Sequence, residues 1–370
     1  MFLFLRTFWC YDAPGEGVKI KTRGDLMAKY RSAVVIGRFQ IFHNEHKQIF
    51  DEALALADQV IIVLGSHLAA LDFRNPFTTD QREEMIRQVY PNANLKFVVV
   101  LDRYYNDSLW IQDVMYRVKE VAPDPRSVVL CGYYKDSTSY YLNYFRETWH
   151  FEAHISKSKL SATELRRNFF HWENVDFEKL KRQVPDSVYT YLVDYKERNH
   201  AKYTHFVKEH KYISEYRRKI QPEGYPYPIQ LVTVDNVVVQ KGHVLMVVRK
   251  AMPGKDLWAF PGGFVKPKES LFNAALRELK EETSLNVHKN ILRRQLKDEK
   301  VFDHPERDLR ARIITHGFYY ELDFPELPQV KGGDDASKAF WVPWDDIIRY
   351  SDRVYTDHVH ILSYFLNRSR

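Results

Sequence analysis

The pattern of apolar and polar positions divides the first half of the chain into strands and helices. Short apolar runs typical of buried strands occupy residues 33–37, 59–64, 95–101 and 127–131. Segments with helical periodicity separate them and cover residues 43–57, 79–89 and 108–121. Strands that alternate with helices predict a parallel sheet with helices on both faces. Ligands bind such sheets at the carboxyl ends of the strands, so the residues there are the first candidates for chemistry.

The second half shows strands and helices without strict alternation. It follows a turn-rich segment, residues 221–228. Strand-like patterns lie at residues 229–239, 243–249 and 313–321, and an uninterrupted helical pattern lies at residues 268–285. Between the halves, residues 186–225 are mainly helical in pattern and interleave tyrosines with basic residues. Such interleaving is compatible with single-stranded nucleic acid. We favour a helix that packs its tyrosines on the domains and turns its charges to water.

Composition narrows the classes of protein that remain. A length of 370 residues predicts two domains, and a net charge of +6 without a long basic block predicts no nucleic-acid partner. Two cysteines without metal spacing indicate a reducing, cytoplasmic location. The sequence contains no run of eighteen apolar residues, so we predict no membrane span. The apolar start is interrupted by Arg6 and lacks the features of a signal peptide, so residues 1–26 are interpreted as an extension of little structure.

The helical segment 268–285 carries the strongest chemical signal. Glu278, Glu281 and Glu282 are three and four residues apart, so one helix face presents all three carboxylates. Their mutual repulsion would be relieved by a hard divalent cation such as Mg2+, which prefers oxygen ligands. Ser270 can cap the start of the helix, and Arg277 can pair with Glu281.

The spacing around these carboxylates resembles the Nudix box. Gly263 is followed after five residues by Glu269, and after seven more by the sequence RELKEE. The family usually has glycine at the position of Ser284, where the helix ends and a positive φ is favoured. The resemblance covers residues 226–365 and implies an α/β/α sandwich. Past the box, residues 302–312 resemble a segment of Nudix enzymes that act on ADP-ribose.

The end of the first predicted strand carries a second resemblance. The sequence GRFQIFHNEH, residues 37–46, is similar to the GRFQPFHxGH signature of nucleotidyltransferases, and in particular of archaeal-type nicotinamide mononucleotide adenylyltransferases. Ile41 replaces the usual proline and Glu45 the usual glycine, which puts a negative charge near the expected phosphate site. Two histidines at the start of a helix can both face an anion.

Further parts of this pattern follow in order along the chain. Residues 75–78 (NPFT) with Arg82 resemble one family segment, and residues 160–166 (LSATELR) resemble the second signature. Asp102, Asn106 and Trp110 fall where the family contacts its mononucleotide, and an indole can stack on a nicotinamide ring. The hydroxyl groups and the arginine of residues 160–166 lie beside the predicted start of a helix, where they can bind a triphosphate.

Together these resemblances imply a bifunctional α/β enzyme of NAD metabolism. Its parts would be an extension (1–26), a Rossmann-like nucleotidyltransferase domain (27–185), a helical connector (186–225) and a Nudix domain (226–370). The first half would transfer the adenylyl group of ATP to nicotinamide mononucleotide. The second would hydrolyse ADP-ribose to AMP and ribose 5-phosphate with Mg2+, for which Mn2+ is an alternative.

The resemblances also imply roles for individual residues. The group implied to bind ATP is Gly37, Arg38, Phe39, His43, His46, Ser161, Thr163 and Arg166, of which His43, His46 and Arg166 would be catalytic. The mononucleotide would contact Arg82, Asp102, Asn106 and Trp110. ADP-ribose would contact Gly262, Gly263, Arg310 and Arg312. Glu278, Glu281 and Glu282 would bind the metal and serve catalysis, with Asp334 or Glu306 as the base.

Two alternatives remain open at this stage. The Nudix half can be a sensor of ADP-ribose that regulates the first half or a partner, although the three intact carboxylates argue against a pure sensor. The first half can be a nucleotidyltransferase for another phosphorylated acceptor. The sequence does not distinguish nicotinamide from nicotinate mononucleotide, and it leaves a homo-oligomer open.

Overall fold

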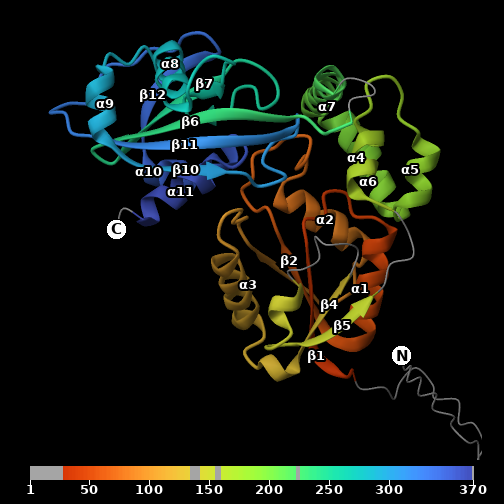
Figure 1. Ribbon diagram of the computed structural model, residues 1–370. Coiled ribbons are helices and arrows are strands. Elements are labelled where there is room, and N and C mark those ends of the chain that lie inside the picture. Colours follow the sequence, from red (N-terminus) through yellow and green to blue (C-terminus); the bar gives the residue numbers. More distant parts are fainter. Residues whose placement is uncertain (1–27, 134–141, 155–159, 222–225, 369–370) are drawn as a thin grey trace, which may run out of the picture.

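The computed structural model describes residues 28–133, 142–154, 160–221 and 226–368. The N-terminal extension expected at residues 1–26 lies outside these ranges. Within them, no helix combines the length and the apolar character needed to cross a membrane. The two halves of the chain form two α/β units, and a group of helices lies beside them (Figure 1).

The first half is built on a five-stranded sheet in the order β3-β2-β1-β4-β5, in which every pairing is parallel. Its strands are β1 (Tyr30–Gly37), β2 (Ala57–Leu64), β3 (Leu95–Val99), β4 (Val128–Tyr133) and β5 (His150–His154). The prediction of a parallel sheet is confirmed. The polar sequence HFEAH gave no signal for the edge strand β5. Strand order reverses between β1 and β4, which is where such sheets bind ligands.

Helices cover both faces of this sheet (Figure 1). They are α1 (Asn44–Leu56), α2 (Thr79–Val89) and α3 (Asp107–Val121). Ala33 of β1 belongs to the apolar core beneath α1 and α2, whereas its neighbour Val34 belongs to the core beneath α3. This alternation follows from the two-residue period of a strand. The run of apolar residues in β1 is therefore needed to fill two cores.

The connector is part of the core of the first half. The helices that follow the sheet are α4 (Ala162–Phe169), α5 (Phe177–Gln183), α6 (Asp186–Arg198) and α7 (His200–Ile220). Tyr195 of α6 and Tyr203, Phe206 and Ile213 of α7 are buried in the same cluster as α1 and α2. The packing of tyrosines predicted for this segment is thus observed. No packing boundary is visible at residue 185.

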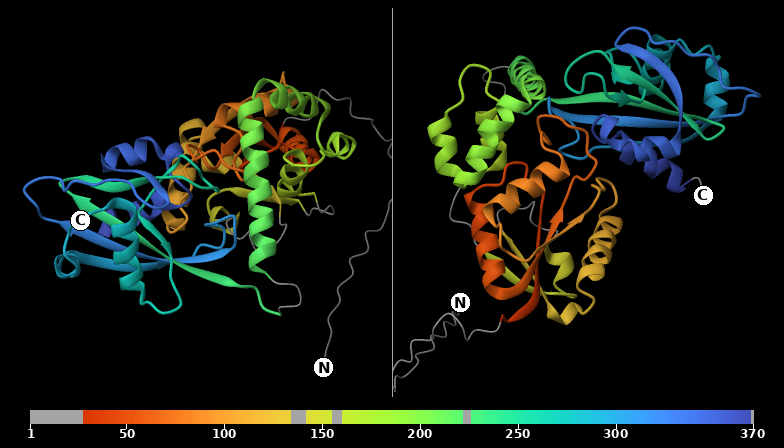
Figure 2. Two further views of the ribbon diagram at one scale, coloured as in Figure 1. Left: turned by 90° about the horizontal axis from the view of Figure 1, so that it is seen from above. Right: turned by 180° about the vertical axis from the view of Figure 1, so that it is seen from behind.

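Helix α7 also joins the two halves through one buried side chain. Glu209 is 1 % exposed, and its carboxylate accepts hydrogen bonds from the backbone N–H groups of Phe73 (2.7 Å) and Gly254 (3.0 Å). Phe73 belongs to the first half and Gly254 to the second. The left view of Figure 2 shows α7 running along the border between the halves.

The second half contains a mixed seven-stranded sheet. Its path is β10-β11-β6-β7-β12, with β8 paired to β7 and β9 to β6. The strands are β6 (Gln230–Gln240), β7 (His243–Arg249), β8 (Trp258–Ala259), β9 (Gly262–Phe264), β10 (Leu296–Phe302), β11 (Arg312–Leu322) and β12 (Ala336–Pro343). Among the strand pairs of this sheet that the structure describes, β6 and β11 are parallel and the others are antiparallel. This arrangement agrees with the predicted departure from strict strand–helix alternation.

Helices lie on both faces of this sheet as well. They are α8 (Leu271–Thr283), α9 (Lys289–Gln295), α10 (Trp344–Arg349) and α11 (His358–Arg368). Val238 of β6 packs in the cluster that contains Leu279 of α8, and Val237 packs in the cluster that contains Phe365 of α11. The sandwich expected from the sequence is therefore confirmed, with the carboxylate-bearing helix as one of its outer layers.

The carboxylate-bearing helix ends in a left-handed residue. Its first turn is capped as predicted, because the hydroxyl of Ser270 accepts from the backbone N–H of Asn273 (3.3 Å). At the other end Ser284 has a φ of 52°. Glycine adopts this conformation without steric cost, whereas a residue with a Cβ does not. The sequence departure at Ser284 thus leaves the turn in place at an energetic cost.

We predict that Ser284→Gly stabilises the second half. The substitution relieves the strain of the left-handed conformation but raises the entropy of the unfolded chain. The net effect is expected to increase the free energy of unfolding by about 0.5–1 kcal/mol. Thermal unfolding would then occur about 1–2 °C higher. Ser284→Ala is the matched control, since it removes the hydroxyl and keeps the Cβ. Equal melting temperatures of the Gly and Ala variants would contradict the strain argument.

Candidate active sites of the two halves

The first candidate site lies where β1 ends and α1 begins. His43 is the residue before α1, and its ring stacks on that of His46 with 3.6 Å between centroids. The backbone N–H of His43 also donates to Nδ1 of His46 (3.3 Å). A Cβ on Gly37 would lie 2.8 Å from the ring of Phe39, so the glycine lets this ring pack closely against the end of β1. The predicted pair of histidines therefore sits together at a helix N-terminus, which attracts anions.

Arg166 joins the two signature segments. Its side chain is buried, and it donates to the carbonyl of Gln40 (3.0 Å) and to the hydroxyl of Thr163 (3.2 Å). Burial and the nearby charge of Arg38 lower the pKa of Arg166 to about 9. Ser161 caps α4 by accepting from the N–H of Thr163 (3.3 Å). The geometry leaves a positive charge beside the turn between β1 and α1.

Glu45 makes a third link at the same place. Its side chain is 5 % exposed, and its carboxylate accepts from the backbone N–H of Leu160 (3.3 Å). The sequence suggested that this carboxylate would act on the phosphate site. The structure instead shows it binding the start of the second signature segment to α1.

A cavity of about 450 Å3 opens in front of these residues, and its wall comes from three parts of the chain. Arg38, Arg74, Thr163 and Arg166 come from the first half. The connector helix α7 contributes Arg217, and the loop before β11 contributes Glu306, whose carboxylate lies 3.9 Å from the guanidinium of Arg38. The excess of arginines suits an anion rich in phosphate. His43, His46 and Ser161 do not line this cavity.

The residues predicted to contact the mononucleotide are spread along the adjoining loop. Asp102 accepts from the N–H (3.1 Å) and the hydroxyl (2.7 Å) of Ser66, at the end of β2. Asn106 caps α3 by accepting from the N–H of Leu109 (3.0 Å). The ring of Trp110 packs edge-on to that of Phe145. Asp102 lines a cavity of about 110 Å3, and Asn106 lines one of about 220 Å3.

Arg82 occupies a different position from the one expected. Its side chain is 1 % exposed, and it donates to the carbonyls of Arg38 (2.8 Å) and Gly65 (2.7 Å). These carbonyls belong to the turns after β1 and β2. The guanidinium of Arg82 therefore holds these two turns together, and Arg82 is absent from the lining of the three cavities described for the first half.

The second candidate site lies on helix α8. Glu278 and Glu282 are buried, and Glu281 is exposed on the same side of the helix. A Cβ on Gly263 would lie 2.6 Å from the carboxylate of Glu278, and one on Gly262 would lie 2.1 Å from the carbonyl of Val234. The glycine pair is therefore explained by close packing against the carboxylate helix and strand β6.

Arg277 organises the carboxylates. It donates to Glu281 (3.0 Å), as predicted, and also to Glu278 (2.6 Å) and through two nitrogens to Glu269 (3.0 and 2.5 Å). These hydrogen bonds lower the pKa of Glu269 to about 2. The five-residue and seven-residue spacings of the motif thus bring Glu269 and Arg277 face to face.

Glu282 and Glu278 experience a less polar environment. Burial raises the pKa of Glu282 to about 8, although its carboxylate accepts from the N–H of Gly262 (2.9 Å), and burial also raises the pKa of Glu278. In the described part of the chain, no group of three or more His, Cys, Asp or Glu side chains is close enough to hold a metal ion in this arrangement. The hydrogen bonds of Arg277 explain this, since they hold two of the three carboxylates.

A cavity of about 540 Å3 adjoins the carboxylates. It is lined by Glu278, Glu281 and Glu282, by the predicted Gly262, Gly263 and Arg310, and by Asp334. Sequence reasoning missed Arg249, Arg307, and the tyrosines of α7, Tyr212 and Tyr216. Arg307 was visible in the segment 302–312 that carried the resemblance. The tyrosines gave no signal, because a tyrosine that packs and one that lines a cavity look alike in sequence.

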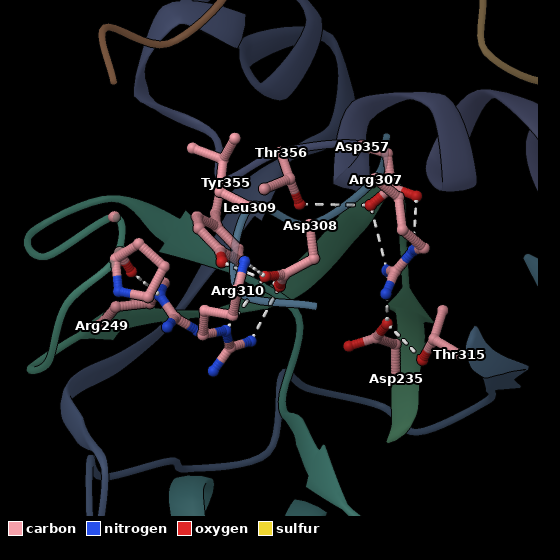
Figure 3. Close-up of polar contacts among 12 residues, drawn as sticks. Asp235, Arg249, Arg307, Asp308, Leu309, Arg310, Thr315, Tyr355, Thr356 and Asp357 are labelled. Atoms are coloured by element: carbon pink, nitrogen blue, oxygen red, sulfur yellow. Dashed lines mark hydrogen bonds and ion pairs between the residues drawn. The ribbon is translucent and has the colours of Figure 1, made fainter. Parts of the chain in front are cut away.

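Two of the predicted residues lie elsewhere. Arg312 does not line the cavity beside α8; it donates to the carbonyl of Asp303 (2.5 Å). Glu306 faces the first site, so of the two candidate bases only Asp334 lines the second. Figure 3 shows Arg310 turned toward Asp308, with 2.8 Å between Nη2 and Oδ2, while Arg307 points toward Asp357 and Asp235.

Comparison with known proteins agrees with this division of the chain. A cytidylyltransferase-like family model matches residues 34–168, and a NUDIX domain model matches residues 230–365. The first half is 35% identical over 153 residues to a nicotinamide/nicotinic acid mononucleotide adenylyltransferase of Acinetobacter baylyi, covering 40% of this chain and 81% of that protein. The second is 37% identical over 109 residues to an ADP-ribose pyrophosphatase of Methanocaldococcus jannaschii, covering 29% of this chain and 59% of that protein.

One solved structure resembles nearly the whole chain. It is a bifunctional NMN adenylyltransferase/ADP ribose pyrophosphatase from Francisella tularensis, complexed with AMP and a manganese ion. It is 32% identical, has a TM-score of 0.82, and covers 92% of this chain and 99% of that one. The chain belongs to the family of bifunctional NMN adenylyltransferase/ADP-ribose pyrophosphatases, whose members join a nucleotidyltransferase half to a Nudix half.

Proposed function

We propose that the first half transfers the adenylyl group of ATP to nicotinamide mononucleotide, and that the second half hydrolyses ADP-ribose to AMP and ribose 5-phosphate. The observation that carries this is the presence of two separate sites of opposite charge. One site lines a cavity with arginines, and the other presents three carboxylates to a cavity. The three substrates, ATP, nicotinamide mononucleotide and ADP-ribose, are small molecules that contain phosphate.

Adenylyl transfer requires no nucleophile from the protein. The 5′-phosphate of the mononucleotide attacks the α-phosphorus of ATP, and pyrophosphate leaves. The first site supplies positioning and positive charge, which are the main contributions to such a reaction. His43 and His46 hold a phosphate at the start of α1, while Arg38 and Arg166 neutralise charge on the triphosphate. Asp102, Asn106 and Trp110 hold the mononucleotide.

Hydrolysis of ADP-ribose uses the carboxylates of α8. Glu278, Glu281 and Glu282 would hold Mg2+, which when bound lowers the pKa of a water and polarises the diphosphate. Their chemistry fits such an ion, because two of the three are buried side by side and a divalent cation offsets the cost of their charge. Arg277 has to release at least one carboxylate for this. Arg249 and Arg310, which line the same cavity, bind the diphosphate.

A product assay on the purified chain tests both reactions. One sample contains Mg2+, ATP and nicotinamide mononucleotide, and another contains Mg2+ and ADP-ribose. NAD+ is expected in the first and AMP in the second. NAD+ without AMP would favour a sensor or a different diphosphate substrate for the Nudix half. AMP without NAD+ would favour a changed or lost transferase in the first half, with Ile41 and Glu45 as the first departures from the signature to examine.

We predict that Glu281→Gln or Glu282→Gln removes hydrolysis and spares adenylyl transfer. Loss of a charged metal ligand is expected to lower the rate of AMP formation about 100-fold or more, because the metal contributes several kcal/mol to transition-state stabilisation. NAD+ formation is measured on the same preparation. Glu326→Gln, at an exposed position, is the control. Parallel loss of both activities would contradict the assignment of one reaction to each half.

We predict the converse result for His46→Ala. Loss of the imidazole beside the phosphates is expected to slow NAD+ formation about 100-fold, in the range found when one stabilising group is removed. AMP formation from ADP-ribose should be unchanged. His200→Ala, at an exposed position on α7, serves as the matched control. Undiminished NAD+ formation would remove His46 from the site.

A further inference from the structure

The mononucleotide-binding loop of the first half lies against the Nudix half. The ring of Tyr104 stacks on that of His304, with 4.2 Å between centroids and 9° between planes. The ring of Tyr105 contacts that of Phe302 at 5.0 Å and packs against the apolar cluster beneath α11. Tyr104 and Tyr105 are therefore inserted into the other half of the chain, although the elements on both sides of them belong to the first.

A hydrogen bond fixes the tip of this loop. The hydroxyl of Tyr105 donates to Oδ2 of Asp357 at 2.5 Å, and Asp357 is fully buried. Asp357 is itself held by Arg307, whose Nε and Nη2 donate to its two oxygens at 2.9 and 3.1 Å. Because both partners are buried and oriented, Asp357 is a fixed acceptor for the tyrosine.

The chain of contacts continues into the hydrolase cavity. Nη2 of Arg307 lies 3.5 Å from Oδ2 of Asp235, and that oxygen accepts from the hydroxyl of Thr315 at 2.7 Å (Figure 3). Arg307 and Asp235 both line the cavity beside the carboxylates of α8. The residue that anchors the loop is thus one contact away from the second site.

The position of the anchor within the loop gives it a function. Asp102 and Asn106 are assigned to the mononucleotide, and Tyr104 and Tyr105 lie between them in the sequence. Asn106 follows Tyr105 directly, so a shift of Tyr105 by one ångström moves Asn106 by a similar amount. Catalysis of this kind depends on placement at that scale. An anchor at Tyr105 therefore sets where the mononucleotide lies relative to ATP.

We propose that Tyr105 is a positioning residue for adenylyl transfer, and that the Nudix half, through Asp357, holds the mononucleotide-binding loop of the first half in its working position. This inference rests on the proposed role of Asp102 and Asn106. It goes beyond that role in giving the Nudix half a part in the transferase reaction. A tyrosine that only fastened the two halves together would not affect one substrate more than another.

The test is Tyr105→Phe in the full chain. The ring and its packing on Phe302 are kept, and only the bond to Asp357 is lost. The KM for nicotinamide mononucleotide is expected to rise about tenfold, since a hydrogen bond to a charged group contributes a factor of at least this order. The KM for ATP, the kcat and the hydrolysis of ADP-ribose should not change. Tyr116→Phe, at a tyrosine that is 60% exposed on α3, is the matched control.

A second variant separates failure of the inference from failure of the proposed function. Asn106→Asp keeps the cap of α3, because aspartate caps helices as well as asparagine does, but it removes the amide. If Asn106→Asp raises the KM for the mononucleotide and Tyr105→Phe does not, the inference is overturned and the role of the loop stands. If neither variant raises it, the loop does not bind the mononucleotide and both are overturned. Equal loss of both activities in Tyr105→Phe would make Tyr105 a structural residue only.

Discussion

The buried guanidinium of Arg307 is the constraint on which the junction of the two halves depends. A charge that is 4 % exposed has to be neutralised, and Asp357 and Asp235 do this from separate segments of the Nudix half. Loss of one partner of such a pair typically costs about 3–5 kcal/mol, because the other charge stays buried. The pairing therefore fixes the loop before β11, which contributes Glu306 to one cavity and Arg310 to the other.

The two sites differ in how their charge is balanced before substrate arrives. In the first, arginines outnumber acidic groups, and Glu306 near Arg38 offsets part of the excess. In the second site, the guanidinium of Arg277 lies among the carboxylates of Glu269, Glu278 and Glu281 and supplies the positive charge that a metal ion would otherwise supply. Each site therefore contains an internal partner of opposite charge. The resting arrangement thus lowers the cost of keeping like charges close together.

Much of the fold follows from local patterns, whereas the site is only partly local. Apolar runs and helical periodicity predicted the central strands and α8, since each is set by neighbouring residues. The carboxylates of α8 and the paired histidines were predicted for the same reason. The contacts of Arg82 and Arg312 were not predicted, because their partners, carbonyls of distant or irregular segments, leave no mark in the sequence. Tyr212 and Tyr216 line the hydrolase cavity through the packing of α7 on both halves, which no spacing within α7 reveals.

The burial of α6 and α7 in the first core bears on how such a fused chain can arise or be divided. A break between the two family segments, anywhere from residue 169 to 229, would either remove Tyr203 and Phe206 from that core or leave Tyr212 and Tyr216 without the cavity that they line. Glu209, which binds the backbone of both halves, would lose one of its partners in every case. Gene fission would therefore yield two products with exposed apolar surface, and once the connector had folded into both halves, selection would tend to keep them in one polypeptide.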